Sequence, residues 1–284
     1  MKLANLAGRL ALVVDGGAID VHDASDGRFG PDPASAYERW DDLVAWAATS
    51  ASSAAPVPFD DADLGAPSPE PRQVFAIGLN YASHAEESGL DLPAVPAVFT
   101  KFPASLGGPF EPIERSGDLV DWEVELVVVI GTRADRVAEA DAWSNVAGLC
   151  VGQDVSDRQV QFAAGAQFSL GKSYRSYGPT GPWLVTPDEL ADPDDLGLGC
   201  SIDGETVQED RTTGLVFSVS RLIAELSAVV PLLPGDLIFT GTPAGVGITR
   251  QPPRFLQVGE VVESWIEGIG TIRNEVVAPK EVAS

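Results

Sequence analysis

The stretch that decides the fold is Asp121–Ile130, which reads Asp-Trp-Glu-Val-Glu-Leu-Val-Val-Val-Ile. Its apolar second half is typical of a buried β-strand, yet Glu123 and Glu125 stand at the beginning of that strand. Side chains of a strand alternate between its two faces, so both carboxylates are expected on the same face. Two like charges beside a core repel each other and lose hydration, and a divalent cation with oxygen ligands would offset both costs.

A third carboxylate follows the next apolar run of the chain, Val146–Val151. Asp154 comes three residues after that run, where a second buried strand is expected to end. The sequence therefore predicts a site for Mg²⁺, Mn²⁺ or Ca²⁺ built from Glu123, Glu125 and Asp154. The alternative is a pair of solvated carboxylates at a strand end and an unrelated aspartate in a turn.

Composition limits the classes of partner. The chain has 284 residues, with 18 Lys and Arg against 42 Asp and Glu, and a formal net charge of −24. This acidic balance argues against nucleic acid and against an anionic membrane surface as partners.

The first apolar run is interrupted by Arg9 and ends at Asp15, which is too short for a signal peptide, and no run reaches membrane-spanning length. Cys150 and Cys200 are expected to be buried and reduced, so we expect a cytoplasmic protein.

Residues 1–70 are expected to form a small N-terminal domain and linker of mixed α and β structure. Leu10–Val14 and Ala18–Val21 flank an Asp-Gly-Gly turn, a typical hairpin signal. Residues 51–70 are rich in Ala, Ser, Pro and Asp without periodicity, which predicts a linker or an extended crossing segment. Between them, one helix face is indicated by the spacing of four apolar residues: Trp40, Leu43, Val44 and Ala47.

Residues 71–284 are expected to form a second, larger domain. Short apolar runs alternate there with Gly and Pro turns, which predicts a mostly β sandwich or barrel with some α-helix rather than a doubly wound parallel sheet. The clearest helix is Ser218–Val230, followed by Pro231 as its stop. Nine runs are expected to be strands: Val74–Gly78, Val98–Lys101, Glu123–Ile130, Ala147–Val151, Trp183–Val185, Gly199–Ile202, Leu237–Thr240, Val261–Ile266 and Gly270–Val276.

A histidine and a glutamate lie three residues apart after the first of these strands. Ser83 is expected to cap a short helix that carries His84 and Glu87 on one side. Histidine is the usual general base near neutral pH, and a neighbouring carboxylate raises its basicity and fixes its tautomer. The pair is therefore a candidate catalytic dyad, with a surface histidine on an acidic helix as the alternative.

Two further polar candidates lie in the segment that follows Asp154. If Ser156 opens a helix, Arg158 and Gln161 share one face of that helix. Arg158 could bind a substrate carboxylate or pair with an acidic ligand, and Gln161 could donate a hydrogen bond to a developing oxyanion. An ordinary capped helix start is the alternative.

The last candidates are a lysine and a glycine-rich loop. Lys172 is a candidate cation for a carboxylate or an enolate. In Thr240–Gly247, the glycines, Gly241 among them, let backbone amides approach a ligand closely. Thr242 offers a hydroxyl and an amide for a substrate carboxylate, and a wide β-turn is the alternative.

Taken together and in this order, the motifs resemble the fumarylacetoacetate hydrolase family over about residues 72–277. The resemblance implies a mixed β-sandwich roll with a small N-terminal α+β domain, a catalytic domain at residues 71–284 and a homodimer. The motifs that carry it are Gly78–Tyr81 with His84 and Glu87, Asp121–Leu126, Asp154–Ser156 with Arg158 and Gln161, Leu170–Ser173, Thr240–Gly247 and Gly268–Thr271.

The resemblance also implies a role for each candidate residue. A divalent metal, usually Mg²⁺, would be held by Glu123, Glu125 and Asp154. The family's His–Glu dyad maps onto a segment that often closes over the substrate. The matching positions are His84 and Glu87 for the dyad, Lys172 for the lysine, Arg158 and Gln161 for the arginine and glutamine, and Thr242, beside Gly241, for the threonine that binds the substrate carboxylate.

Two single positions and one short segment depart from the family pattern. Gln153 stands where Asn is usual before the ligand aspartate, and Asp157 stands where a small residue is usual. Asp157 adds negative charge near the site. Tyr174–Tyr177 replaces the usual Phe-Asp-Thr, which indicates a different substrate.

The chemistry that the resemblance implies is metal-dependent hydrolysis of the C–C bond of a 2,4-diketo acid such as an acylpyruvate, which releases pyruvate and a carboxylic acid. Family sites of this kind also decarboxylate oxaloacetate, or isomerise or hydrate 2-oxo-dienoates, as 2-hydroxyhepta-2,4-diene-1,7-dioate isomerases do. A non-catalytic metal-binding protein on the same fold is the second alternative. A protein that had lost its catalytic function would have no physical reason to keep paired acids, which argues against that alternative.

Overall fold

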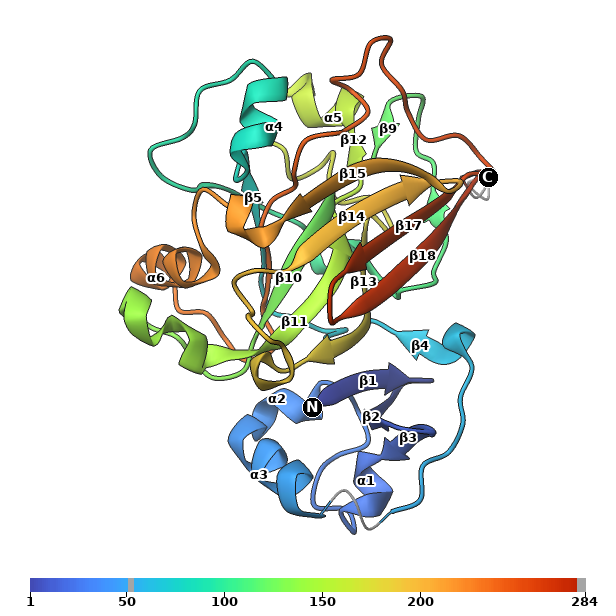
Figure 1. Cartoon of the computed structure of the whole chain (residues 1–284), viewed down its shortest axis with the longest axis vertical. Coiled ribbons are helices and arrows are strands. Elements are labelled where there is room, and N and C mark those ends of the chain that lie inside the picture. The colour runs from blue at the N-terminus through green and yellow to red at the C-terminus, as the bar shows by residue number, and fades with distance from the viewer. Residues whose placement is uncertain (51–53, 280–284) are drawn as a thin grey trace.

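A computed structural model of the chain describes residues 1–50 and 54–279. The chain is mostly β, with a long central sheet, a five-stranded sheet in front of it and a few short helices (Figure 1). The strand order of the central sheet is β3-β2-β1-β13-β11-β10-β16-β5-β6, with β4 paired to β1 and β7 to β13. Parallel pairs, such as β16 with β5, occur beside antiparallel ones, so the predicted mixed β architecture is confirmed.

Most strands of the central sheet belong to the larger predicted domain. They are β5 (Val74–Gly78), β6 (Ala97–Thr100), β7 (Leu106–Gly107), β10 (Val124–Ile130), β11 (Val146–Gln153), β13 (Gly178–Val185) and β16 (Leu237–Phe239). The front sheet has the order β15-β14-β17-β18-β8, and β9 pairs with β12 in a separate ribbon. Those strands are β8 (Ile113–Glu114), β9 (Val120–Asp121), β12 (Ser156–Asp157), β14 (Gly197–Ile202), β15 (Glu205–Arg211), β17 (Val261–Ile266) and β18 (Gly270–Val277).

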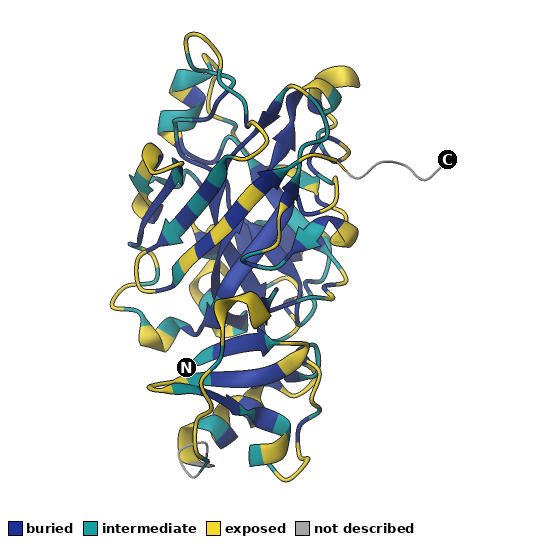
Figure 2. Ribbon diagram, turned by 90° about the vertical axis from the view of Figure 1, so that its right-hand side faces the viewer, coloured by how far each residue is buried: buried dark blue, intermediate teal, exposed yellow. Residues whose placement is uncertain are grey.

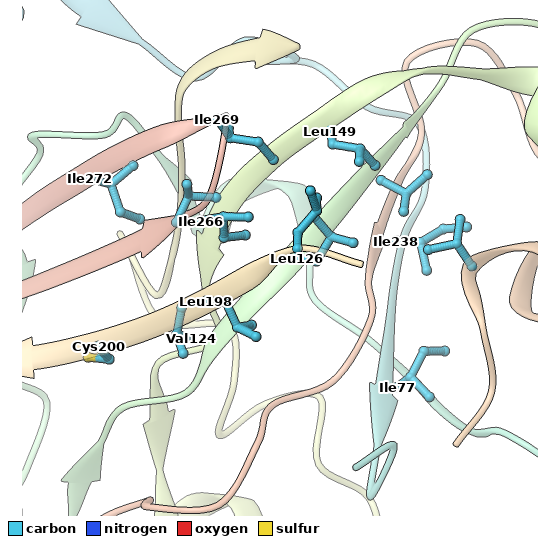
Figure 3. Close-up of a cluster of buried hydrophobic side chains, with 14 of the residues drawn as sticks. Ile77, Val124, Leu126, Leu149, Leu198, Cys200, Ile238, Ile266, Ile269 and Ile272 are labelled. Atoms are coloured by element: carbon cyan, nitrogen blue, oxygen red, sulfur yellow. The ribbon is translucent and has the colours of Figure 1, made fainter. Parts of the chain in front are cut away.

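β10 is buried on both faces, which explains its continuous apolar run. Its even-numbered residues, such as Val124 and Leu126, pack into the core between the two sheets, together with Leu198 and Ile272 of the front sheet (Figure 3). Its odd-numbered residues, Val127 and Val129, enter a second core on the opposite side. Glu125 is also odd-numbered, and Glu123 directly precedes the strand in the same alternation, so both carboxylates point to the side of the second core.

The N-terminal strands extend the central sheet rather than forming one of their own. β1 (Lys2–Leu6) pairs with β13 on one side and with β2 (Arg9–Val14) on the other, and β2 pairs with β3 (Gly17–Asp20). β4 (Leu64–Gly65) then returns to β1, so part of the expected linker is a strand. In Figure 2, strands of this unit and of the main sheet are drawn largely in the dark blue of buried residues. The division into domains at residues 70 and 71 stays a prediction.

Two details of the N-terminal unit correct the sequence analysis. Val21, expected to end a strand, begins the short helix α1 (Val21–Ala24), because the side chain of Asp20 caps it by accepting a hydrogen bond from Asp23 N. The expected helix is present as α3 (Trp40–Ser50), after α2 (Ser35–Glu38). Its buried face holds Trp46 in place of Val44, which is 38% exposed. The rest of the expected linker includes residues 51–53, which lie outside the described residues.

The helices of the larger domain are short. α4 (Ala82–Glu87) and α5 (Arg158–Ala163) lie at the end of the molecule away from the N-terminal unit (Figure 1). The expected helix after residue 217 is α6 (Val219–Val229), capped by the hydroxyl of Ser218. No helix in the described part of the chain is long and apolar enough to span a membrane.

All nine expected strands are present, and Val74–Gly78 and Val261–Ile266 have the expected bounds. β1 and β15 were not expected. The pattern of β15 explains why: only Val207 and Gln208 are buried in this strand, so it has almost no apolar signal.

Candidate metal centre and its cavity

The three predicted metal ligands converge. β10 and β11 pair in an antiparallel register that sets Val124 opposite Gln153, so Glu123 and Asp154 lie side by side just beyond the pair. One carboxylate oxygen from each of Glu123, Glu125 and Asp154 lies within 4.8 Å of the others, and all three residues are buried. The alternative of separate, solvated carboxylates is therefore wrong.

Main-chain and amide hydrogen bonds fix this convergence. Asp154 N donates to Glu123 O at 2.9 Å. The side chain of Gln153 accepts from Glu123 N at 2.8 Å and donates to Ser264 Oγ at 2.8 Å. Gln153, which departs from the family pattern, thus ties the first ligand to the front sheet.

Three buried cations surround the acids. Lys172 Nζ bridges Glu123 Oε2 at 2.6 Å and Asp154 Oδ2 at 2.7 Å. Lys101 Nζ contacts the other oxygen of Asp154 at 2.6 Å and also donates to the main-chain oxygen of Lys172. Arg158 Nη1 lies 2.7 Å from Glu123 Oε1.

Arg158 is oriented by a fourth buried carboxylate. Its Nε donates to Asp121 Oδ2 at 2.8 Å, and its Nη2 lies 2.7 Å from the same oxygen at an angle that is poor for a hydrogen bond. Asp121 also accepts from Gly247 N and Ile248 N at 2.7 and 3.0 Å, so it joins the arginine to the glycine-rich loop. Of the two roles expected for Arg158, pairing with an acidic ligand is the one that its contacts display.

The pKa shifts follow this charge arrangement. Burial alone would raise the pKa of Glu123, but Lys172 and Arg158 outweigh it and hold that pKa at about 2. Burial, then Asp154 and Glu123, raise the pKa of Glu125 well above its ordinary value. Burial would lower the pKa of Lys172, yet Asp154 and Glu123 raise it overall. For Lys101, burial prevails and lowers the pKa.

The donor set fits a hard divalent cation. All three converging groups are carboxylates, without the sulfur or nitrogen that softer metals prefer. Asp121 and these three acids make four buried carboxylates against the three cations Lys101, Arg158 and Lys172. Within residues 1–50 and 54–279, no cation pairs directly with Glu125, and its Oε2 accepts the amide hydrogen of Gly241 at 2.7 Å. The charge balance therefore favours a cation at Glu125.

The predicted dyad is assembled. His84 Nδ1 lies 2.7 Å from Glu87 Oε1. The other oxygen of Glu87 accepts from Gly245 N at 2.9 Å and from Thr249 Oγ1 at 3.0 Å. Burial would raise the pKa of Glu87, but the hydrogen bonds from His84 and Gly245 lower it overall. An ionised Glu87 accepts the Nδ1 proton, which leaves Nε2 of His84 as the free proton acceptor.

Two helix starts differ from the expectation. Tyr81, not Ser83, precedes α4, and the hydroxyl of Ser83 instead donates to Asp210 at 3.1 Å. α5 is capped by Asp157, which accepts from Val160 N at 3.1 Å, whereas Ser156 belongs to β12. The cap explains the unusual aspartate at position 157. Arg158 and Gln161 nevertheless share a face of α5, since Arg158 Nη1 donates to Gln161 Oε1 at 2.9 Å.

The glycine-rich loop is positioned differently from the expectation. The amide of Gly241 is committed to Glu125, so it supports a metal ligand and does not face open space. The hydroxyl of Thr242 donates to Val124 O at 2.9 Å and accepts from Gln208 Nε2 at 2.8 Å. The main-chain N–H of Thr242 has no partner among the residues that the structure describes, which makes it the donor that remains for a ligand.

A cavity of about 120 Å³ lies against the acids. Seven of the ten predicted site residues line it, and the other three support lining residues from behind: Glu87 contacts His84, Gly241 contacts Glu125, and Asp154 contacts Lys172. The seven are His84, Glu123, Glu125, Arg158, Gln161, Lys172 and Thr242.

Comparison with known proteins decides the family. The family model described as fumarylacetoacetate (FAA) hydrolase C-terminal matches residues 73–277. The chain belongs to the fumarylacetoacetate hydrolase family. Among curated relatives, the mitochondrial oxaloacetate tautomerase Fahd2a of Rattus norvegicus is 43% identical over 223 residues, which cover 78% of this chain and 71% of that protein.

Solved structures of the family match nearly the whole chain. A protein from Mycobacterium smegmatis, provisionally named HpcE, is 51% identical with a TM-score of 0.93, and the match covers 99% of this chain and 100% of that one. The maleylpyruvate hydrolase of Sphingobium sp. SYK-6, solved in complex with manganese(II) and pyruvate, is 28% identical with a TM-score of 0.81. That match covers 99% of this chain and 100% of the hydrolase chain.

Several residues of this family site were not found from the sequence. The sequence around Lys101 and Asp121 predicts no role for either residue, because a buried ion pair leaves no periodic signal. Gln208 lies in the unexpected strand β15, where it accepts from Val124 N at 3.0 Å and orients Thr242. The scarcity of lysine was the one usable sign for Lys101: the chain has only four.

Proposed function

We propose that the chain hydrolyses the C–C bond of a 2,4-diketo acid of the acylpyruvate type, and releases pyruvate and a carboxylic acid. The single observation that carries the proposal is the joint presence of the His84–Glu87 pair and the carboxylate cluster at one cavity. A relative with the same fold is named a maleylpyruvate hydrolase and was solved with manganese(II) and pyruvate, which supports the choice of substrate class.

Glu123, Glu125 and Asp154 would hold the metal, with Mg²⁺, Mn²⁺ or Ca²⁺ as the hard cations that suit carboxylates. When bound, the cation supplies positive charge for the 2-oxo and carboxylate oxygens of the substrate. Four ionised carboxylates and three charged cations leave the buried cluster with a formal charge of about −1. A bound dication would change that formal charge to about +1, which suits an anionic 2-oxo acid.

His84 acts as the general base of the proposed reaction. Held by Glu87 through Nδ1–H, it takes a proton at Nε2 from a water molecule, whose oxygen forms a bond to the 4-carbonyl carbon. The C3–C4 bond then breaks, and its electron pair leaves as the enolate of pyruvate. The proton on His84 passes to C3 of that enolate, so one water is consumed and the histidine returns to its neutral form.

The remaining lining residues stabilise charge. The ammonium of Lys172 lies at the acids and can bind the enolate oxygen. Gln161 uses its carbonyl oxygen on Arg158, which leaves its NH₂ group to donate to the tetrahedral oxyanion. The free N–H of Thr242 can donate to the substrate carboxylate.

A second candidate is proton transfer without cleavage, as in tautomerisation of oxaloacetate. It is favoured by the 43% identity to a protein of that name, and it would use His84 without a water nucleophile. Isomerisation of a 2-oxo-diene-dioate uses the same enolate-stabilising groups and belongs to this second class. Decarboxylation of oxaloacetate also uses these groups but breaks a C–C bond, so it would be recognised by the release of pyruvate and CO₂ from oxaloacetate.

The two candidates separate in one experiment. Purified protein with Mg²⁺ is given acylpyruvates, oxaloacetate and 2-oxo-dienoates, and enol absorbance is followed together with release of pyruvate and carboxylic acid. Equimolar pyruvate and acid from an acylpyruvate, abolished by chelator and by His84→Ala, is the result that we expect. Loss of the oxaloacetate enol band without pyruvate, and no acylpyruvate cleavage, would replace the first candidate by the second.

We also propose that the active form is a cytoplasmic homodimer. The expectation comes from the family resemblance, and the two free, buried cysteines suit a reducing compartment. Light scattering of the purified protein would test the dimer, and a monomer at micromolar concentration would contradict it.

A further inference from the structure

The wall of the cavity beyond the acids is aromatic. Phe99 and Phe168 meet edge to face with ring centroids 5.8 Å apart, and Phe162 and Phe168 do so at 5.9 Å. Leu90 and Ile248 line the same cavity. These side chains come from β6, α5 and three loops, so the apolar wall is assembled from distant parts of the chain.

This aromatic wall adjoins the carboxylates and cations of the candidate metal centre. The ammonium of Lys172 lies 5.2 Å from the centroid of the Phe99 ring while it contacts Glu123 and Asp154. On α5, Gln161 and Phe162 are neighbours, and both line the cavity. A 2-oxo acid whose carboxylate end lies at the acids therefore extends its other end over the rings.

Each of the cations that line the cavity already contacts an acid of this site. Arg158 is committed to Asp121 and Glu123, and Lys172 to Glu123 and Asp154. His84 is paired with Glu87. A carboxylate at the distal end of a substrate would lie beside phenylalanine with no cation dedicated to it, and would lose the part of its hydration that the rings displace.

We propose that the site selects 2-oxo acids with an apolar distal group, and disfavours dicarboxylates. The inference rests on the proposed function and names its substrate class: acylpyruvates with an alkyl or aryl acyl group. It separates the chain from relatives named for oxaloacetate and for maleylpyruvate, which are both dicarboxylates. Phe162 and Leu90 are 51% and 55% exposed, so a distal group that covers them removes apolar surface from water.

The test uses binding, so it does not depend on turnover. Protein with saturating Mg²⁺ is titrated by calorimetry with 2-oxobutanoate, 2-oxohexanoate and 2-oxoadipate, none of which has a 4-carbonyl to be cleaved. Each buried methylene should tighten binding about fourfold, so 2-oxohexanoate should bind roughly tenfold or more tighter than 2-oxobutanoate. We expect 2-oxoadipate to bind at least tenfold more weakly than 2-oxohexanoate, which has the same chain length.

A substitution at the exposed rim makes the test specific. Phe162→Arg supplies the missing cation and should bring 2-oxoadipate to within threefold of 2-oxohexanoate. The matched control is Phe102→Arg, at a residue that is 47% exposed and does not line the cavity; it should leave the ratio unchanged.

The outcomes distinguish this inference from the proposed function. Equal or tighter binding of 2-oxoadipate by the unmodified protein, with acylpyruvate cleavage intact, overturns the inference alone. A flat series from 2-oxobutanoate to 2-oxohexanoate does the same, and would assign the aromatic wall to packing against another surface. If no 2-oxo acid binds in the presence of Mg²⁺, both the inference and the proposed function fail.

Discussion

The ammonium group of Lys172 lies 2.6 Å from a carboxylate oxygen of Glu123, one of the three residues that would hold a metal ion. The same ammonium lies 2.7 Å from Asp154 Oδ2, so it spans two of the three predicted ligands. A lysine in this position neutralises the acids of the metal-free protein. A cation held by the same carboxylates would have to share them with Lys172, so we expect lysine and metal to compete.

Lys172→Met should therefore strengthen Mg²⁺ binding while it abolishes turnover. Removal of the internal competitor favours the metal, and removal of the enolate partner stops the reaction. Calorimetric Mg²⁺ titrations and acylpyruvate assays measure the two effects. Weaker Mg²⁺ binding in this variant would show that Lys172 supports the metal rather than competing with it.

Lys101→Met removes the second lysine that contacts Asp154, the one at its other carboxylate oxygen. Lys101 contacts no second ligand, and both residues of this pair are fully buried. Breaking a buried ion pair by removing one partner costs about 3–5 kcal/mol, so we expect a loss of that size in the free energy of unfolding, measured in urea with chelator. Lys2→Met, at a partly exposed position, should change it by less than about 0.5 kcal/mol. Equal unfolding midpoints for the Lys101 variant and the unmodified protein would contradict the assignment.

Glu125→Gln should separate folding from metal binding. The pKa of Glu125 is raised by burial and by the neighbouring acids, so a neutral amide there relieves repulsion in the metal-free protein and keeps the oxygen that accepts from Gly241. With Mg²⁺ at a hundred times its Kd, the unmodified protein should gain about 2.7 kcal/mol of stability. A variant with a hundredfold weaker Kd gains only about 0.4 kcal/mol under the same conditions. Glu209→Gln, on the exposed side of β15, is the control and should gain as much as the unmodified protein.

The sequence alone predicts those site residues whose positions depend on strand alternation or on family motifs. Glu125 in β10 and Glu123 just before it share a face because the chain is extended there, and Asp154 joins them because β11 returns antiparallel to β10. The register that brings Asp154 to Glu123 is a tertiary property, and so is the partner of each cation. Lys101 follows β6, some fifty residues before Asp154, and no local pattern shows that a lysine there will be buried.

The helix starts show the same limit at short range. Ser83, Ser156 and Asp157 are all good capping residues, and the sequence alone favours whichever stands nearest the expected start. In the structure, Asp210 takes the hydroxyl of Ser83, while Asp157 caps α5 because the β9–β12 ribbon holds Ser156 as a strand residue. Contacts from distant strands therefore decide which local signal is used.

Alkaline pH should destabilise the fold through the buried thiols. Burial raises the pKa of Cys200 to about 12 and that of Cys150 still further, whereas an unfolded thiol titrates near about 8.5. Because the folded pKa is the higher one, the unfolded state loses protons first, and stability is complete below about pH 8.5 and falls from there toward pH 12. Urea unfolding at pH 8, 9 and 10 should show this slope, and Cys200→Ser should reduce it by about half, because Cys150 still contributes. A slope unchanged in the variant would assign the loss to other groups.

Glu87→Gln should reduce turnover without weakening metal binding. The carboxylate holds His84 Nδ1–H at 2.7 Å, and an amide in its place no longer fixes the tautomer that frees Nε2. We expect kcat to fall about 10²–10⁴-fold, with KM and the Mg²⁺ affinity little changed, because the substrate's 2-oxo acid end is bound elsewhere. Glu86→Gln is the matched control: this residue is exposed on the same helix and should keep full activity. A variant that loses Mg²⁺ affinity together with kcat would mean that Glu87 acts by holding Gly245 and Thr249, and so the loop beside the acids, rather than by orienting the base.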